Sequence, residues 1–280
     1  MAPVPGGTVP GMGWPVQVVE VTGSTSADLL QEARAGGRGP RFLAARAQTA
    51  GRGRLDRGWH SPPGASLAVS LLFAPEVPQA GWTWLPMVVG LGVLDALRGM
   101  GATAVLKWPN DVVVPLPEPG GGATGTAGTT GPPEGAMTGL AKLAGVLVQG
   151  VAGSAGPVAV VGVGLNLRPP GDVGARSASL ADLLDGDAPD GPSCFDRVLP
   201  ALTGALTQRL LGWEADGGRS TGTRAAYLRA CSTMGRQVRV STPAGQVSGR
   251  AVDVAEDGAL VLDGPDGRVR VLAGDVEHVR

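Results

Sequence analysis

A glycine- and arginine-rich stretch, residues 51–64, constrains the fold of this chain more than any other feature. Its sequence, GRGRLDRGWHSPPG, contains four glycines and three arginines, and it leads directly into 66–73, SLAVSLLF. Apolar residues alternate with small or polar ones along 66–73, which predicts a β-strand with one apolar face. Glycine lets the main chain adopt many conformations, so we expect 51–64 to be a loop joined to a sheet.

Strand and helix patterns alternate on both sides of this loop. Helices are predicted from Thr25, which has capping-box spacing to Asp28, and at 84–101, 179–186, 193–213 and 223–235. The predicted strands lie at 16–21, 41–48, 66–73, 104–114, 143–152 and 157–167. This alternation favours a domain in which helices pack on a sheet.

The texture of the sequence changes near Arg236. Short valine-rich segments follow, separated by the turn sequences PAG (243–245), EDG (256–258) and GPDG (264–267). Turns at this spacing predict a small all-β barrel of about five strands, with a boundary near 233–236.

Two segments lack the large apolar residues that a core needs. Residues 115–138, PLPEPGGGATGTAGTTGPPEGAMT, predict a flexible surface insertion between two ordered strands, because little apolar surface is available to offset the entropy of ordering them. Residues 1–15 are rich in glycine and proline, and we expect a disordered N-terminal segment. The first large domain then covers 16–232 and the second covers 233–280.

The overall charge argues against two classes of partner. The formal net charge is −1, whereas proteins dedicated to nucleic acids or membrane surfaces usually carry a clear basic excess. We therefore expect no nucleic acid and no membrane among the partners.

The targeting features favour a cytoplasmic protein. The N-terminal residues lack the basic and apolar regions of a signal peptide, and no run approaches about 18 uninterrupted apolar residues. Cys194 and Cys231 show neither CxxC nor metal-ligand spacing, so a disulfide framework is not expected.

The arginines of 51–64 suit an anionic ligand. Gly51 and Gly53 let the main chain approach closely, while Arg52, Arg54 and Arg57 offer forked hydrogen bonds to a carboxylate or phosphate. A solvated arginine–glycine turn would explain GRGR alone. Its direct continuation into a patterned strand favours a binding loop.

The motif KWPND, residues 107–111, offers a second group of ligand-binding side chains. Lys107 can hold a phosphate, and Pro109 restricts the turn so that Asn110 and Asp111 project in a set direction. A carboxylate beside an anion site is what Mg²⁺ commonly uses, together with phosphate oxygens. The alternative is an ordinary Pro-Asn turn.

Three further segments have both a binding and a structural interpretation. Lys142 stands at the start of a buried strand pattern, where it is either a ligand contact or a solvated end of the strand. The segment GVGLNL (162–167) lacks the third glycine and helix start of a dinucleotide site, so it is either a close strand packing or part of another site. GSTS (23–26) offers hydroxyls and N–H groups to a ligand, or simply caps a helix.

In the order in which they occur, these motifs resemble those of biotin protein ligases, the biotin–carboxyl-carrier-protein ligases. The motifs are GSTS, then QxxGRGRxxRxWxSPPGxxLxxSxLL, KWPND, KLAGVL and GVGLNL, over about residues 18–168. The resemblance implies an α/β (α+β) fold: a class II synthetase-like, lipoate-ligase-like catalytic domain with a mixed sheet, followed by a small C-terminal SH3-like β-barrel. No DNA-binding domain is expected, which indicates the monofunctional type.

The resemblance also implies a two-step reaction. Biotin and MgATP form biotinyl-5′-AMP, and biotin is then transferred to a specific lysine of the biotin carboxyl carrier domain of an acyl-CoA carboxylase. The expected ligands are therefore biotin, ATP and Mg²⁺. Asp111 is expected to bind Mg²⁺ and to orient the acceptor amine.

The residue roles implied by the resemblance fall into three groups. The catalytic residues are expected to be Arg52, Arg54, Asp111 and Lys142. Biotin is expected to contact Ser24, Thr25, Ser26, Gln48, Arg52, Gly53, Arg54 and Lys142. ATP or the adenylate is expected to contact Gly51, Trp59, Lys107, Asn110 and Asn166.

This sequence departs from the family pattern at two positions within its motifs. Ser26 stands where the family usually has Asn, and Asp56 stands where it usually has Gly. Two other functions stay open: a lipoate or octanoate protein ligase on the same scaffold, and a non-catalytic biotin-responsive regulator. The GRGRxxRxW run argues against the first, and the missing DNA-binding domain against the second.

Overall fold

A computed structural model describes residues 8–9, 13–54, 57–116, 139–153, 156–169, 176–184, 192–218 and 221–279. The insertion expected at 115–138 lies outside these residues from 117 onward, as does Asp56. The strands are β1 (Thr8–Val9), β2 (Val16–Thr22), β3 (Arg41–Arg52), β4 (Gly58–Ser61), β5 (Ser66–Phe73), β6 (Val105–Lys107), β7 (Asp111–Leu116), β8 (Gly139–Gly153), β9 (Gly156–Asn166), β10 (Gln237–Thr242), β11 (Gly245–Val254), β12 (Leu260–Gly264), β13 (Gly267–Val271) and β14 (Asp275–His278). The helices are α1 (Thr25–Arg34), the 3-10 helix η2 (Gln79–Trp84), α2 (Leu85–Gly99), α3 (Pro192–Ala215) and α4 (Thr221–Ala230).

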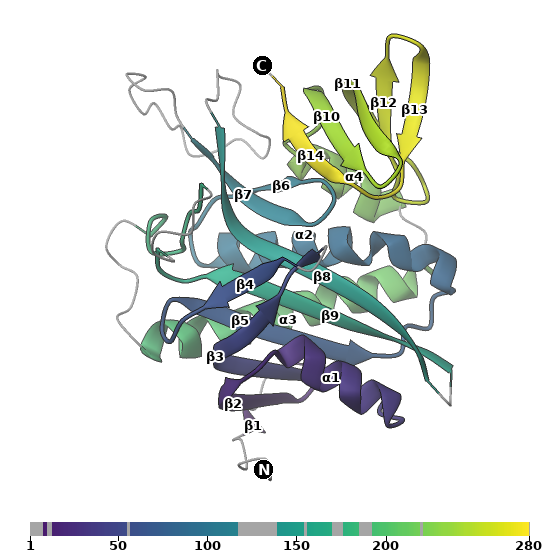
Figure 1. Ribbon diagram of the computed structural model, residues 1–280. Coiled ribbons are helices and arrows are strands. Elements are labelled where there is room, and N and C mark those ends of the chain that lie inside the picture. Colours follow the sequence, from purple (N-terminus) through teal and green to yellow (C-terminus); the bar gives the residue numbers. More distant parts are fainter. Residues whose placement is uncertain are drawn as a thin grey trace.

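The larger sheet has the predicted mixed topology. Its strand order is β1-β2-β3-β5-β9-β8-β7-β6, with β4 paired to β3. β2 and β3 run parallel because α1 connects them as a crossover, and the other neighbours are antiparallel. β5 and β9 therefore lie at the centre of the sheet (Figure 1).

Helices cover both faces of this sheet. α2 and α3 pack on one face, where Leu67, Val69 and Leu71 join the main core. On the other face, Leu29 and Leu30 of α1 pack with Leu72 in a second cluster. All eight residues of β5 are consequently buried, although its alternating pattern predicted one apolar face only. The polar side of that pattern is covered by the start of α1, which places Ser70 in a buried environment.

Three local predictions were wrong. Residues 104–114 form the hairpin β6–β7 instead of one strand, because the expected turn at Pro109 reverses the chain over residues 108–110. The described part of 179–186 is a series of turns that Asp182 closes by accepting from Ser179. Thr8–Val9 form β1 on the edge of β2, so part of 1–15 is ordered.

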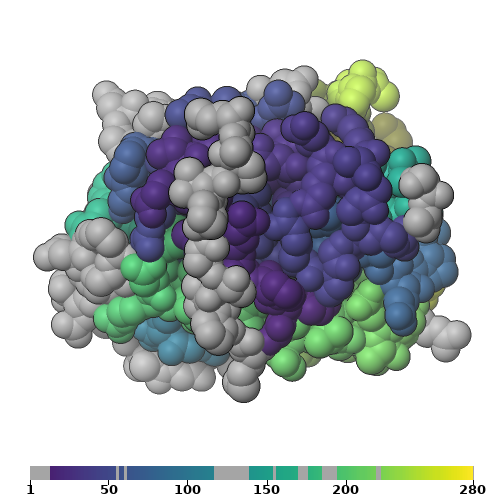
Figure 2. Space-filling view, turned by 90° about the horizontal axis from the view of Figure 1, so that it is seen from below, coloured from purple at the N-terminus to yellow at the C-terminus, as the bar shows by residue number. Residues whose placement is uncertain are grey.

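The C-terminal residues form the predicted five-stranded antiparallel sheet, in the order β13-β12-β11-β10-β14. Two indole N–H groups of the larger domain bond to carbonyls between β11 and β12: Trp84 donates to Glu256 at 2.7 Å and Trp108 donates to Gly258 at 3.1 Å. These bonds hold the second sheet against the hairpin β6–β7 and α2 (Figure 1). In a view from below, residues of the N-terminal part, coloured purple, lie in the middle of the face, and the C-terminal residues are seen only at one edge (Figure 2).

One described helical segment, Gln79–Gly99, is long and apolar enough to span a membrane by length and composition. Most of it is buried, and α2 packs against α3 and the sheet, so it is a core helix. Cys194 and Cys231 are both buried, and each is a free cysteine.

Candidate active site

A single cavity of about 1050 Å³ gathers nearly all of the predicted site residues. Its walls come from the start of α1, the loop between β3 and β4, the β6–β7 turn, and strands β5, β8 and β9. The predicted residues that line it are Ser24, Thr25, Ser26, Gln48, Gly51, Arg52, Gly53, Arg54, Trp59, Asn110, Asp111, Lys142 and Asn166. Lys107 does not line it and lies behind Asp111, its partner across the hairpin.

One end of the cavity carries uncharged hydroxyl and amide groups. Thr25 donates its main-chain N–H to Gln48 Oε1 at 2.8 Å, and its hydroxyl lies 2.7 Å from that of Ser70. Ser70 also lies 2.9 Å from the hydroxyl of Ser26. A Cβ on Gly162 would come within 2.4 Å of the Ser26 hydroxyl, so glycine is needed for this close packing. Buried hydroxyls can both donate and accept, which suits a neutral polar group of a ligand.

The cap of α1 differs from the predicted one. Ser24, with φ −162° and ψ 124°, is the N-cap and accepts from Ala27 N at 3.4 Å, whereas the spacing had indicated Thr25. Thr25 is thereby left to bond with Gln48 and Ser70 inside the cavity. The residues at the start of α1 therefore both cap the helix and form part of the cavity wall.

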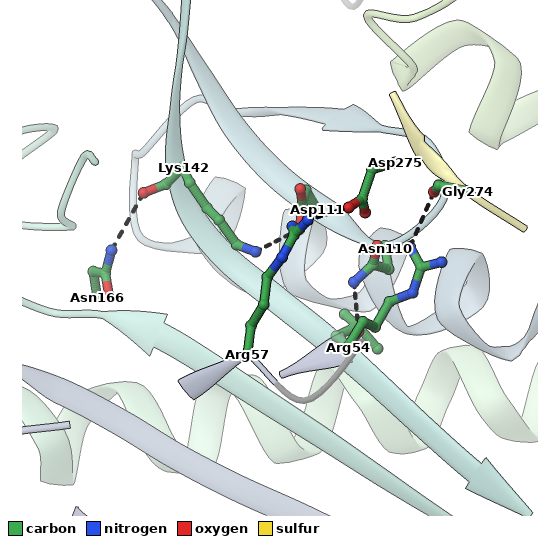
Figure 3. A network of polar contacts seen from close by, with 9 residues as sticks. Arg54, Arg57, Asn110, Asp111, Lys142, Asn166, Gly274 and Asp275 are labelled. Carbon is green, nitrogen blue, oxygen red and sulfur yellow. Dashed lines mark hydrogen bonds and ion pairs between the residues drawn. The ribbon is translucent and has the colours of Figure 1, made fainter. Parts of the chain in front are cut away.

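The arginine loop between β3 and β4 is folded over the cavity. Gly53 N donates to Arg57 O at 2.7 Å, and Arg57 N donates to Arg54 O at 3.2 Å, which closes the loop on itself. A Cβ on Gly51 would meet the carbonyl oxygen of Trp59 at 2.4 Å, so only glycine fits there. Arg54 donates to Asn110 Oδ1 at 2.8 Å and to Gly274 O at 3.4 Å, and Arg57 forms an ion pair with Asp275 (Figure 3). The loop is thus attached to both the β6–β7 turn and the second sheet.

Lys142 and Asp111 form an ion pair at the charged end of the cavity. Lys142 Nζ lies 2.7 Å from Asp111 Oδ1, and their side chains are 39% and 23% exposed (Figure 3). The ammonium group also lies 5.6 Å from the centre of the Trp59 ring. An anionic ligand would meet Lys142 together with the neighbouring arginines, which is the arrangement needed to hold two negative groups close together.

The Trp59 ring lies flat against two glycines of the sheet. A Cβ on Gly164 would come within 2.3 Å of the ring, and one on Gly145 would come within 3.4 Å. The indole N–H is buried and has no hydrogen-bond partner among the described residues. The two glycines therefore make room for a flat aromatic surface that faces the cavity.

The carboxylate of Asp111 could bind a magnesium ion only if a bound ligand supplied further oxygen atoms to the ion. Among the described residues, no group of three or more His, Cys, Asp or Glu side chains could hold a metal ion. Asp111 faces the cavity beside cationic groups that suit phosphates. Mg²⁺ usually takes one or two carboxylates and completes its shell with phosphate oxygens and water, so this single carboxylate is compatible with a phosphate-borne ion.

His278 of β14 lies close enough to Lys107 of β6 for their charges to interact. Burial lowers the pKa of Lys107, and the neighbouring Asp111 opposes that change. Burial also lowers the pKa of His278 to about 4, with further contributions from the positive charges of Lys107 and Arg236. His278 is therefore neutral at neutral pH.

This neutral histidine makes the protein less stable in acid. The unfolded chain binds a proton near pH 6.5 and the folded chain only near pH 4, so stability falls as the pH drops through that window. Between pH 7 and 4.5 the free energy of unfolding should fall in both proteins. We expect the fall in His278→Gln to be smaller than that in the native protein by roughly 1–2 kcal/mol, after allowance for partial exposure. Urea unfolding at both pH values measures this. His60→Gln is the control, and equal losses in the His278 variant and the native protein would contradict the prediction.

Several cavity residues were not predicted from the sequence, among them Ser70, Arg176, Ser177 and Asp275. Ser70 was noted only as part of the polar side of a strand pattern, which was the available signal. Arg176, Ser177 and Asp275 line the cavity from segments distant in sequence, and no local pattern marked them.

The fold and cavity together define an α/β domain whose cavity has a neutral polar end and a cationic end. Residues 18–166 match the Biotin/lipoate A/B protein ligase family, and residues 233–279 match the Biotin protein ligase C terminal domain. The chain belongs to the biotin/lipoate A/B protein ligase family.

Similar proteins extend over almost the whole chain. The biotin–[acetyl-CoA-carboxylase] ligase of Mycobacterium tuberculosis is 38% identical and covers 96% of this chain and 91% of its own length. The enzyme of the same name from Paracoccus denitrificans is 30% identical, with 91% and 97% covered. The Aquifex aeolicus biotin protein ligase in complex with biotin and ATP has the same fold, with a TM-score of 0.70, 24% identity and coverage of 95% and 98%.

Proposed function

We infer that this chain is a biotin–[acetyl-CoA-carboxylase] ligase. The two relatives of that name cover over nine-tenths of the chain. The structural observation that carries the inference is the division of one cavity into an uncharged hydroxyl end and a cationic end. Biotin has a neutral ureido ring and a carboxylate tail, and ATP brings phosphates, so the two ends suit the two kinds of group.

The first step joins two anions. A biotin carboxylate oxygen forms a bond to the α-phosphorus of ATP, the bond to the β-phosphate breaks, and pyrophosphate leaves with biotinyl-5′-AMP as product. The carboxylate is ionised at neutral pH, so no base is needed. Lys142 and the arginine loop reduce the repulsion between the reactants and stabilise the charge that develops on the phosphate.

The hydroxyl end positions the other part of biotin. Thr25, Ser26 and Gln48 would bind the ureido ring, with Ser70 holding both hydroxyls of α1 in place. Ser26 stands where relatives usually carry Asn, and its bond to Ser70 gives it a fixed position in this chain. The Trp59 face and Asn166 would border the adenylate.

The second step transfers biotin to a carrier protein. The amine of a lysine on the biotin carboxyl carrier domain attacks the acyl carbon, the bond to AMP breaks, and the amine loses a proton. Asp111 is placed to orient that amine, because its carboxylate lies at the charged end of the cavity. We assign the catalytic domain to residues 16–232 and the second domain to residues 233–280. We also propose that the protein acts in the cytoplasm.

Magnesium is proposed as a companion of ATP. When bound, it would neutralise phosphate charge and polarise the phosphate oxygens. Asp111 and Asn110 are the residues that would hold it, and Lys107 lies behind them as a further positive charge.

The assay for this function measures pyrophosphate release with ATP and biotin, followed by biotin transfer to a carrier domain. We expect pyrophosphate only when both substrates are present, and a biotinylated carrier when it is added. Pyrophosphate release with lipoate in preference to biotin would instead indicate a lipoate ligase. Biotin binding without pyrophosphate release would indicate a regulator.

Replacing Arg54 with glycine is expected to release the adenylate into solution. Arg54 joins the loop to Asn110 and Gly274, and hydrogen bonds from a charged donor contribute about 1.5–3 kcal/mol each. We expect the dissociation rate of biotinyl-5′-AMP to rise by roughly 10- to 100-fold while synthesis continues. Release of labelled adenylate measures this. Arg268→Gly, on an exposed part of β13, is the control, and unchanged release from Arg54→Gly would contradict the role.

A further inference from the structure

Lys142 lies in the part of β8 that is no longer paired with β9. β8 and β9 pair from Gly153 and Gly156 down to Ala144 and Leu165, and the pairing stops before Lys142. β8 also has a register shift against β7 here, between the partners of Val112 and Val113. The main chain of Lys142 therefore needs a partner from another part of the protein.

Residues 176–182, which we name the brace, supply that partner. Lys142 N donates to Arg176 O at 2.9 Å, and Ala178 N donates to Lys142 O at 2.9 Å. This is a parallel bridge between Lys142 and Ser177. The brace takes the place that β9 would have filled, and it holds the catalytic lysine by its main chain.

Asn166 joins the brace to both strands. Its side-chain amide nitrogen donates to Lys142 O at 3.2 Å and to Ala178 O at 3.1 Å, and its main-chain carbonyl accepts from Leu180 N at 2.9 Å. Asn166 is 5% exposed. The brace is thus connected to β8 and to the end of β9 at one point.

A carboxylate outside the cavity closes the turn at the end of the brace. Asp182 Oδ2 accepts from both the main-chain N–H and the hydroxyl of Ser179, each at 2.8 Å. Ser179 is fully buried, so both of its donors would be left without a partner if the carboxylate were removed. Asp182 does not line the cavity.

We propose that Asp182 is a positioning residue for Lys142. It fixes the turn at Ser179, the turn fixes the brace, and the brace sets the main chain of Lys142 so that its ammonium group reaches Asp111 and the cavity. The proposal rests on the proposed function, because it assigns Lys142 to the formation of the adenylate. A displacement of about 1 Å in a catalytic group can cost up to about 100-fold in rate.

The test is a double-mutant cycle on the rate of pyrophosphate release with ATP and biotin. We expect Asp182→Ala to lower the rate roughly tenfold, and Asp182→Asn, which keeps an acceptor oxygen, to restore it to within about threefold of the native rate. In the Lys142→Ala background, Asp182→Ala should change the residual rate by less than about twofold, because there is no lysine left to position. Asp266→Ala, on an exposed turn of the second sheet, is the matched control.

Each other outcome counts against the proposal. A native rate in Asp182→Ala shows that the turn does not affect Lys142, and an equal loss in both backgrounds shows a general structural effect. If Asp182→Ala does not fold, Ser179→Ala, which keeps the main-chain bond to Asp182, is expected to give a smaller loss with the same dependence on Lys142. If the native protein releases no pyrophosphate, the proposed function itself is wrong. If the native protein is active and the Asp182 variants are unaffected, only the positioning role of Asp182 is wrong.

Discussion

Lys142→Ala is expected to lower the rate of biotinyl-5′-AMP formation by at least about 1000-fold, or about 4 kcal/mol in transition-state stabilisation. In the native protein the ammonium group lies 2.7 Å from Asp111 and faces the cavity. Without the ammonium group, the biotin carboxylate and the α-phosphate of ATP must approach each other beside the negative charge of Asp111, which Lys142 no longer neutralises. The rate of pyrophosphate release at saturating ATP and biotin measures the effect.

Two comparisons distinguish this loss from misfolding. Lys142→Arg keeps the positive charge and is expected to recover part of the rate, though its fork has a different shape from an ammonium group. The melting temperature of Lys142→Ala should stay near that of the native protein, since the side chain is 39% exposed. Adenylate formation within tenfold of native in Lys142→Ala would remove the lysine from the catalytic role.

Gly164→Ala is expected to lower kcat/KM for ATP by roughly 100-fold while biotin binding changes less. The new methyl group would lie 2.3 Å from the Trp59 ring, which cannot bend and must leave its position on the sheet. The flat surface that we propose to border the adenylate is then lost. Steady-state kinetics with each substrate varied in turn measures the effect.

A matched glycine elsewhere provides the control. Gly212 lies in α3 with open space where a Cβ would be, so Gly212→Ala should leave kcat/KM unchanged and stabilise the helix by up to about 1 kcal/mol. Removing the ring as well, in Gly164→Ala with Trp59→Ala, should give little further loss, because both changes affect the same surface. Normal ATP kinetics in Gly164→Ala would show that the ring does not contribute to nucleotide binding.

The sequence predicted the elements whose signal lies within a few residues. The apolar pattern of 193–213 predicted α3, and the turn-separated valine segments predicted the second sheet. The glycines and arginines of 51–64 predicted a loop; Gly51 and Arg52 instead end β3 and Gly58–Ser61 form β4, but the arginines do line the cavity. In each case the pattern that allowed the prediction lies within the segment itself.

The failures came from residues whose surroundings are distant in sequence. A turn at Pro109 was predicted, but the strand pattern of 104–114 did not reveal that its two arms pair as a hairpin or that Trp108 contacts the second sheet. The leucines of 179–184 follow a helical spacing, yet Asp182 closes a turn there and the preceding residues pair with Lys142. Tertiary pairing outweighs a weak local helix preference.

By itself, the amino-acid sequence determined which chemical groups are present and in what order: the hydroxyls of 24–26, the arginine loop, Asp111 and Lys142. Only the tertiary structure decided which of them share one cavity and which side chains join them. Ser70 meets Thr25 from 45 residues away, and Arg57 meets Asp275 across 218 residues. Local patterns report contacts within one element, whereas the order of strands in the sheet and the docking of the second sheet set contacts between elements.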